Sequence, residues 1–379
     1  MKKLFYTGAV LLVLFEIANV YFIMPLPGSQ EVKSIDLAYF LYTKRFFIRI
    51  VLGLAMLAGL VSAFKGSKWL TILVLLVIAA LMYMVKFEMA ADSMFLEPGY
   101  MQMESVTNNQ VSDERLVLGV ALNGEARAYP IQYIGYHHKV FDTIGDKPIM
   151  VTYCTVCRSG RVFEPVIHDK QEKFRLVGMD HFNALFEDNT TKTWWRQATG
   201  EAIAGPLKGE KLPEVPALQT SLATWLLMYP NSLIMQPDST FQSIYDSMSD
   251  YESGLRKGDL TRRDSSAWKD KSWIAGIVIH DLSKAYDWNE LVNKGIILDK
   301  LDTFPVAILV TKDQLSLFAY IRKSDSQQLS FRNDTLTDCV INYTLLGKAV
   351  DTTGQDLIPV PVYQEYWHSW KTFHPETAR

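Results

Sequence analysis

The sequence predicts an α+β protein in which three transmembrane helices precede a strand-rich, duplicated domain of two pseudo-symmetric halves. Three observations favour this fold class. Long apolar stretches are concentrated near the N-terminus of a chain of 379 residues whose mean hydropathy is +0.03. Short runs with strand-like alternation fill most of the remainder. A stretch that begins at Gly119 also resembles one that begins at Gly276, 157 residues later (276 − 119).

Residues 1–90 are predicted to form a membrane region. Apolar stretches at residues 4–23, 46–64 and 69–85 each approach the roughly 17–25 residues that a helix needs to cross the hydrocarbon core. The link between the second and third stretches is so short that they must form a tight helical hairpin. The lipid bilayer is therefore the expected partner of this region.

The predicted location is the cell (inner) membrane, with several spans and the C-terminal domain on the extracytoplasmic side. Three spans place the two chain ends on opposite sides. The flanking positive charges are nearly balanced, so orientation depends on the first helix, whose Lys2 and Lys3 favour a cytoplasmic N-terminus.

Two charged residues lie within the predicted spans, Glu16 and Arg49. Both lie toward the membrane face that carries the first loop. An unpaired charge at this depth is costly, so we expect an ion pair between them. The alternative is that Arg49 extends its side chain to the lipid headgroups.

The remainder of the chain contains an internal sequence repeat of two copies. "GVALNGEARAYP" at residues 119–130 resembles "GIVIHDLSKAYD" at 276–287, and "GEAIAGPLKGEKLPEVP" at 200–216 resembles "GKAVDTTGQDLIPVP" at 347–361. We predict a first repeat at residues 91–240, a solvated linker at 241–272, and a second, degenerate repeat at 273–379. Within each repeat the patterns predict a hairpin, a short helix, a buried strand and a closing helix.

Composition and motifs exclude several classes of function. A net charge of −3 provides no basic surface for nucleic acid. No glycine-rich phosphate loop lies between a strand and a helix, so no nucleotide cofactor is expected. Covalent haem attachment needs a histidine directly after a Cys-x-x-Cys pair, where this chain has Arg158.

The candidate site is the stretch "VTYCTVCRSG" at residues 151–160, which holds two of the three cysteines. A strand, a Cys-x-x-Cys turn and a return strand resemble a metal-binding knuckle, in which both sulfurs can face one ion. Two thiolates and one imidazole, with Met179 nearby, favour a soft ion such as copper, and two thiolates with two imidazoles suit zinc. The predicted metal ligands are Cys154, Cys157, His137 and His181, with Met179, His138 and Asp180 as further donors and with Tyr153 and Arg158 lining the site.

Three other interpretations compete with a metal site. The pair can be a thiol–disulfide redox centre, although the residues that follow it read as a strand and not as the activating helix of thioredoxin-like proteins. It can be two buried cysteines with a packing role only. The domain can also be a non-catalytic binding or assembly module that uses the groove between its halves. Whether the protein is an enzyme stays open.

The internal repeat places the site in the first half. Cys154 aligns with Thr311, Cys157 with Gln314 and His137 with Lys294, so the second half keeps the scaffold without these groups. His138 directly follows His137 in a predicted helix, and only one of two such neighbours can face inward. His368 and His374 belong to the closing helix of the second half, far from the cysteines in sequence.

Residues 116–377 resemble the prokaryotic family of uncharacterised proteins known as domain of unknown function 3179. The resemblance rests on "YHHKVFDTIGDKPIMVTYCTVCRSGRVF", on "WWRQATGEAIAGPLKGEKL" and on closing helices that end in "YP" or "FHP". The family pattern of a histidine followed by Tyr-Cys-x-x-Cys maps onto His137, Tyr153, Cys154 and Cys157. The chain departs from it at His138 and Arg158, where the family usually has glutamate and glycine. The resemblance implies a shared domain and a site at these residues, and no particular reaction.

Overall fold

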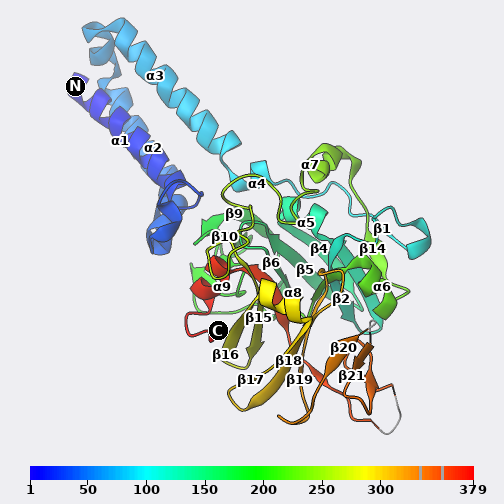
Figure 1. The fold of residues 1–379 in the computed structure, drawn as a ribbon. Coiled ribbons are helices and arrows are strands. Elements are labelled where there is room, and N and C mark those ends of the chain that lie inside the picture. Colours follow the sequence, from blue (N-terminus) through cyan, green and yellow to red (C-terminus); the bar gives the residue numbers. More distant parts are fainter. Residues whose placement is uncertain (333–334, 351–353) are drawn as a thin grey trace. The chain divides into compact units, whose positions relative to one another are not determined.

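A computed structural model describes residues 1–332, 335–350 and 354–379 (Figure 1). Contacts divide the chain into two units, each made of two segments. We call residues 1–96 and 172–211 the membrane unit, and residues 97–171 and 212–379 the strand-rich unit. Residues 333–334 and 351–353 of the predicted second repeat lie outside the described residues.

The membrane unit contains three helices that are long and apolar enough to cross a membrane: α1 (Lys2–Tyr21), α2 (Ile35–Gly66), and α3 (Lys68–Tyr83) with its π-helical extension η2 (Met84–Glu88). The three helices contact one another (Figure 1). Only Ser67 separates α2 from α3, which confirms the predicted helical hairpin.

The second membrane helix begins at Ile35, not near residue 46 as the hydropathy predicts. Its first turns contain polar residues, so hydropathy alone misses them. They are stabilised by tertiary packing, because Tyr39 and Tyr42 place their rings edge-on against Trp194.

The predicted intramembrane ion pair between Glu16 and Arg49 is confirmed. The Arg49 guanidinium donates to both carboxylate oxygens, over 2.6 and 2.7 Å, and the Glu16 side chain is fully buried. Arg49 therefore points to its partner and not to the headgroups.

Residues 172–211 add a four-stranded antiparallel sheet to the membrane unit, in the order β12-β11-β10-β9. Its apolar face packs against the chain around Ile23 and the start of α2. Met179 donates a backbone hydrogen bond to Ile23, and Arg175 contacts the Tyr42 hydroxyl over 2.6 Å. The elements are β9 (Phe174–Asp180), β10 (Asn183–Asp188), β11 (Trp194–Arg196) and β12 (Ala202–Ala204), with η1 (Ser29–Glu31) and α4 (Ala91–Met94) elsewhere in the unit.

The strand-rich unit begins with the predicted hairpin. Asn123 and Gly124 form its two-residue turn, and their positive φ angles of 50° and 86° are those of the tight turn that Asn-Gly favours. A short helix and a three-stranded antiparallel sheet follow. The first-half elements are β1 (Met103–Glu104), η3 (Val106–Asn108), β2 (Leu116–Leu122), β3 (Glu125–Pro130), α5 (Ile131–His137), β4 (Lys139–Ile144), β5 (Lys147–Cys154), β6 (Ser159–Phe163), β7 (Val166–Ile167), β8 (Lys170–Gln171), β13 (Leu218–Ser221), α6 (Leu222–Met228) and β14 (Leu233–Met235).

The second half has the same order of hairpin, helix, three strands and closing helix. In the first half β13 pairs with β2, and in the second β24 pairs with β15, both antiparallel. The second-half elements are β15 (Trp273–Ile279), β16 (Leu282–Asp287), α8 (Trp288–Lys294), β17 (Ile296–Leu301), β18 (Phe304–Val310), β19 (Leu317–Ile321), β20 (Ser330–Arg332), β21 (Thr335–Thr337), β22 (Asn342–Tyr343), β23 (Ile358–Pro359), β24 (Val362–Tyr366) and α9 (Trp367–Phe373).

A tryptophan fixes each closing helix to its own hairpin. A Cβ atom on Gly119 would overlap the Trp225 ring, and one on Gly276 would overlap the Trp370 ring, so each glycine allows an indole to lie on the strand. The indole nitrogens donate to Ser232 and Thr377, each seven residues further along the chain.

The segment between the halves is packed more closely than the predicted solvated linker. It contains η4 (Ser239–Phe241) and α7 (Gln242–Ser247), and Tyr245 and Tyr251 are fully buried. The charge pattern misses this packing because the anchors are aromatic, whereas most of the charged residues at 255–270 stay exposed.

Candidate functional site

The two cysteines of the Cys-x-x-Cys stretch lie at the turn between two paired strands. Cys154 is the last residue of β5, and β6 begins at Ser159, so the predicted strand, turn and return strand are confirmed. Both side chains are free thiols that are fully buried. They hydrogen-bond to each other, which places the two sulfurs side by side.

The second half of the unit supplies a histidine to this pair. The backbone N–H of Tyr366 donates to the Cys157 carbonyl over 2.9 Å, which holds the start of α9 against the cysteine turn. His368, in the first turn of α9, lies beside the Cys157 thiol and interacts with it electrostatically. Its Nδ1 lies 3.0 Å from the Asp270 carbonyl oxygen, so Nδ1 carries the proton and Nε2 faces away from this carbonyl.

His368 belongs to the second half, whereas the sequence predicted a site in the first half. Separation in sequence concealed it, because α9 reaches Cys157 only through the pairing of the two halves. A matching contact exists on the other side, where the Ser221 N–H at the start of α6 donates to the Ser316 hydroxyl over 2.9 Å. Each closing segment thus contacts the turn of the other half.

A half-buried amine lies beside the thiols. Lys271 Nζ donates to the Val156 carbonyl over 2.8 Å, within the Cys-x-x-Cys turn, and lies 4.8 Å from the centre of the Tyr366 ring. Burial lowers the pKa of Lys271 to about 8, while the neighbouring thiols of Cys157 and Cys154 act in the opposite direction. The amine can stabilise negative charge on the sulfurs.

Burial raises the pKa of Cys157 well above its usual value, and the hydrogen bond with Cys154 raises it further. His368 acts against this shift. The thiol is therefore protonated near neutral pH, because this enclosed position disfavours an isolated thiolate. A cation bound by the sulfurs would reverse that preference.

His137 and His138 are both buried, which corrects the prediction that only one of them faces inward. α5 ends at His137, and His138 adopts a left-handed conformation with φ of 61°, which turns its side chain off the helical register. His137 Nε2 lies 2.6 Å from the Tyr245 hydroxyl, and His138 Nδ1 lies 3.0 Å from the Tyr136 carbonyl oxygen. Burial lowers the pKa of His138 to about 4, so its ring is neutral.

Tyr153 and Arg158 flank the cysteines and have structural partners. Tyr153 is fully buried, with its hydroxyl 3.4 Å from that of Tyr251. Arg158 is also buried, lies 3.8 Å over the Trp273 ring and donates to the Gln364 side chain over 3.1 Å. Its guanidinium therefore joins the two halves.

His181, Asp180 and Met179 belong to the membrane unit. His181 and Phe182 form the turn between β9 and β10, both with positive φ. His181 Nδ1 lies 2.8 Å from an Asp180 oxygen, and Arg196 donates twice to the other oxygen. Burial acts to raise the pKa of Asp180, but His181 and Arg196 lower it overall. A carboxylate on one ring nitrogen is typical of metal-binding histidines, and the roles of His181, Asp180 and Met179 as donors stay predictions.

Across the residues that the structure describes, no group of three or more His, Cys, Asp or Glu side chains is placed to hold a metal ion. Cys154 and His368 both lie beside Cys157. Ligation by His137 stays a prediction.

The model of one protein family, described as a protein of unknown function (DUF3179), matches residues 96–377. The chain belongs to this family. Neither a curated protein nor a solved structure matches the chain. The DUF3179 match begins after the three apolar helices and includes both the cysteine turn and the sheet at residues 172–211. The family description assigns no function.

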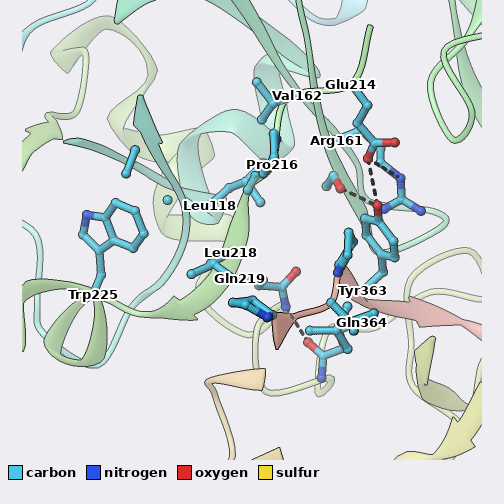
Figure 2. A pocket seen from close by; sticks show the side chains of 18 of the residues that line it. Leu118, Arg161, Val162, Glu214, Pro216, Leu218, Gln219, Trp225, Tyr363 and Gln364 are labelled. Atoms are coloured by element: carbon cyan, nitrogen blue, oxygen red, sulfur yellow. Dashed lines mark hydrogen bonds and ion pairs between the residues drawn. The ribbon is translucent and has the colours of Figure 1, made fainter. Parts of the chain in front are cut away.

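The DUF3179 region also encloses a cavity of about 450 Å³ between the two halves of the strand-rich unit (Figure 2). Strands β2 and β6 and the approach to α6 line it from the first half, and residues 359–364 line it from the second. Figure 2 shows Trp225 on one side and Arg161, Glu214 and Tyr363 on the other. The repeat comparison pointed to a groove between the halves but identified none of these lining residues.

Proposed function

We propose that this DUF3179 protein binds a soft transition-metal ion, copper(I) in the first place, through Cys154 and Cys157. The observation that carries the proposal is the mutual hydrogen bond of two fully buried thiols, one of which also contacts the His368 imidazole. Two sulfurs and an imidazole are the donors that copper prefers. His368 takes the place that the sequence assigned to His137.

The surroundings favour copper over zinc. Zinc sites usually hold four donors, whereas copper(I) is stable with two or three soft ligands. Two thiolates on a monovalent cation leave one negative charge, and the Lys271 ammonium beside the turn would balance it. Full burial of the sulfurs suits an enclosed ion whose net charge is balanced by this neighbouring ammonium.

Thiol–disulfide exchange is the second candidate, because the sulfurs are close enough to hydrogen-bond. In that reaction one thiolate attacks a disulfide of a partner, the second thiolate resolves the mixed disulfide, and the partner leaves as a dithiol. Full burial and the raised pKa of Cys157 disfavour the attacking thiolate. We therefore rank thiol–disulfide exchange below metal binding as a candidate function.

The proposal includes a duplicated domain on the extracytoplasmic side of the membrane. The parallel order of elements and the matching Gly119–Trp225 and Gly276–Trp370 contacts support the duplication. Cys339 provides a test of orientation, because it is exposed. A thiol reagent that cannot cross membranes should label Cys339 in intact cells, and labelling only after lysis would place the domain inside.

The binding test uses the full chain in detergent, reduced and free of oxygen. Copper(I) supplied from a chelate of known affinity should bind at one ion per chain, with sulfur-to-copper absorption in the near ultraviolet. Cys154→Ser and Cys157→Ser should abolish binding, and His368→Ala should weaken it by about 10–100-fold. Cys339→Ser is the matched cysteine control, and His374→Ala is the control on the same helical segment.

Two results would contradict the metal proposal. One is stoichiometric copper that survives both serine substitutions. The other is no bound copper or zinc, together with a reversible Cys154–Cys157 disulfide in a glutathione titration followed by mass spectrometry, which would establish the redox alternative.

A further inference from the structure

The cavity between the two halves has the size and lining of a small-molecule site. Its volume of about 450 Å³ lies within the roughly 300–1,000 Å³ typical of ligand pockets. Such pockets combine apolar walls with a few convergent polar groups. Figure 2 shows an apolar side chain, Trp225, on one side of this cavity and the charged Arg161 and Glu214 on the other.

One end of the cavity is apolar and rigid. Trp225 lies against Gly119, stacks on Tyr229 with ring centres 4.4 Å apart, and donates its indole N–H to Ser232 over 2.8 Å. Leu118 and Leu218 extend this surface. Because the indole packs against the strand and against Tyr229 and is hydrogen-bonded at its nitrogen, the apolar wall is formed before any ligand arrives.

The other end carries charge. Arg161 is buried and pairs with the equally buried Glu365, and its Nε lies 3.5 Å from Glu214. The Tyr363 hydroxyl donates to the same Glu214 oxygen over 3.1 Å. One guanidinium therefore faces two carboxylates.

The excess charge at this end is negative and accessible. The Glu365 side chain is 1 % exposed, and its negative charge offsets the positive charge of Arg161. The Glu214 side chain is 32 % exposed and lines the cavity. A carboxylate with two oxygens accepts several hydrogen bonds, and both the Arg161 ion pair and the Tyr363 hydrogen bond are made to Oε1. A ligand's ammonium group can then approach Oε2.

We propose that this cavity binds a small organic cation, whose amine pairs with Glu214 and whose flat apolar body lies toward Trp225. An anionic ligand is disfavoured because the buried Glu365 already neutralises Arg161. Binding of an organic cation in this cavity does not depend on the cysteine site. It gives a ligand class to the interpretation of the domain as a binding module.

The test measures binding of arylalkylamines to the full chain in detergent by titration calorimetry. The probes are phenethylamine, tyramine and tryptamine, each compared with the matched arylpropionic acid. The expected result is binding of one amine per chain and no binding of the acids. Glu214→Gln should weaken amine binding by about tenfold or more, because a charge-assisted hydrogen bond is lost.

Controls separate a lost site from a lost fold. Glu290→Gln changes an exposed carboxylate on α8 and should leave amine binding unchanged. Ala217→Phe fills the cavity and should abolish binding while Glu214 stays in place. Thermal unfolding curves verify that each variant is folded. The proposal is overturned if none of the three amines binds the wild type, if the acids bind equally well, or if both variants in the cavity bind as the wild type does.

Discussion

The side-chain amide of Gln219 donates a hydrogen bond to the side-chain oxygen of Gln364, with 2.6 Å between the two atoms. Each glutamine is the third residue after a proline that the proposed repeat aligns, Pro216 and Pro361. Under the proposed repeat, the contact joins equivalent positions of the two halves. Arg158 donates to the same Gln364 oxygen over 3.1 Å, so the cysteine turn is linked to this contact.

Replacement of Gln364 should therefore cost more than replacement of Gln219. Gln364→Leu leaves two buried donors without this acceptor, one of them the charged Arg158, and should lower the free energy of unfolding by about 2–3 kcal/mol. Gln219→Leu removes one neutral hydrogen bond and should cost about 1 kcal/mol. Urea unfolding of the full chain in detergent measures both, with the exposed Gln328→Leu as control; equal losses would contradict the asymmetry.

The Glu16–Arg49 pair should respond in opposite ways to single and double substitution. Arg49→Gln leaves the buried Glu16 carboxylate unpaired and should cost about 3–5 kcal/mol of stability. The double variant Glu16→Gln with Arg49→Gln removes both charges and should recover most of this loss. Thermal unfolding in detergent provides the measurement, and Lys68→Gln is the control at the end of a span. A double variant no more stable than Arg49→Gln would show that the pair is not the cause.

Lys271 should make stability depend on pH. Its pKa is about 8 in the folded protein against 10.5 for an ordinary lysine. Between these values the unfolded chain binds more protons at this position, so stability rises with pH across that window. The free energy of unfolding of the wild type should increase relative to that of Lys271→Met by about 1–3 kcal/mol between pH 8 and 10.5. Lys269→Met, at an exposed position, should follow the wild type; parallel curves for wild type and Lys271→Met would contradict the shift.

The three cysteines should separate into two classes of reactivity. Cys339 is exposed, whereas Cys154 and Cys157 are buried and the pKa of Cys157 is raised. Under reducing, metal-free conditions a chromogenic disulfide reagent should react quickly with one thiol per folded chain and with three after denaturation. Cys339→Ser should remove the fast phase. A second fast thiol in the folded protein would mean that the cysteine pair is accessible.

The features that were predicted correctly depend on local pattern. The Asn123–Gly124 hairpin, the strands around the Cys-x-x-Cys turn and the membrane helices all follow from periodicity and composition. Glu16 and Arg49 could be paired because two charges in neighbouring apolar spans, both toward the face that carries the first loop, have few other partners. The start of α2 was missed because packing against Trp194, and not hydropathy, sets it.

The remainder of the site depends on contacts between distant segments. His368 is separated from Cys157 by more than half of the strand-rich unit's sequence. The two come together because the Tyr366 N–H donates to the Cys157 carbonyl, a contact that no local pattern predicts. Lys271 lies in a charged stretch whose sequence resembles a solvated linker, so its contact with the cysteine turn could not be predicted. His138 alone departs from the helical conformation at the end of α5, and its left-handed backbone allows its side chain to be buried together with that of His137.

The insertion of residues 172–211 into the membrane unit has a practical consequence for handling the protein. The chain leaves the strand-rich unit after Gln171 and returns at Leu212, so no single cut separates the two units. A shortened protein that starts after the apolar helices would keep β9–β12 but lose the segments that cover Trp194, Val177 and Ile203. An uncovered apolar sheet face promotes aggregation. Solubility should therefore be sought by exchanging the detergent or lipid around the whole chain, and not by removing its N-terminus.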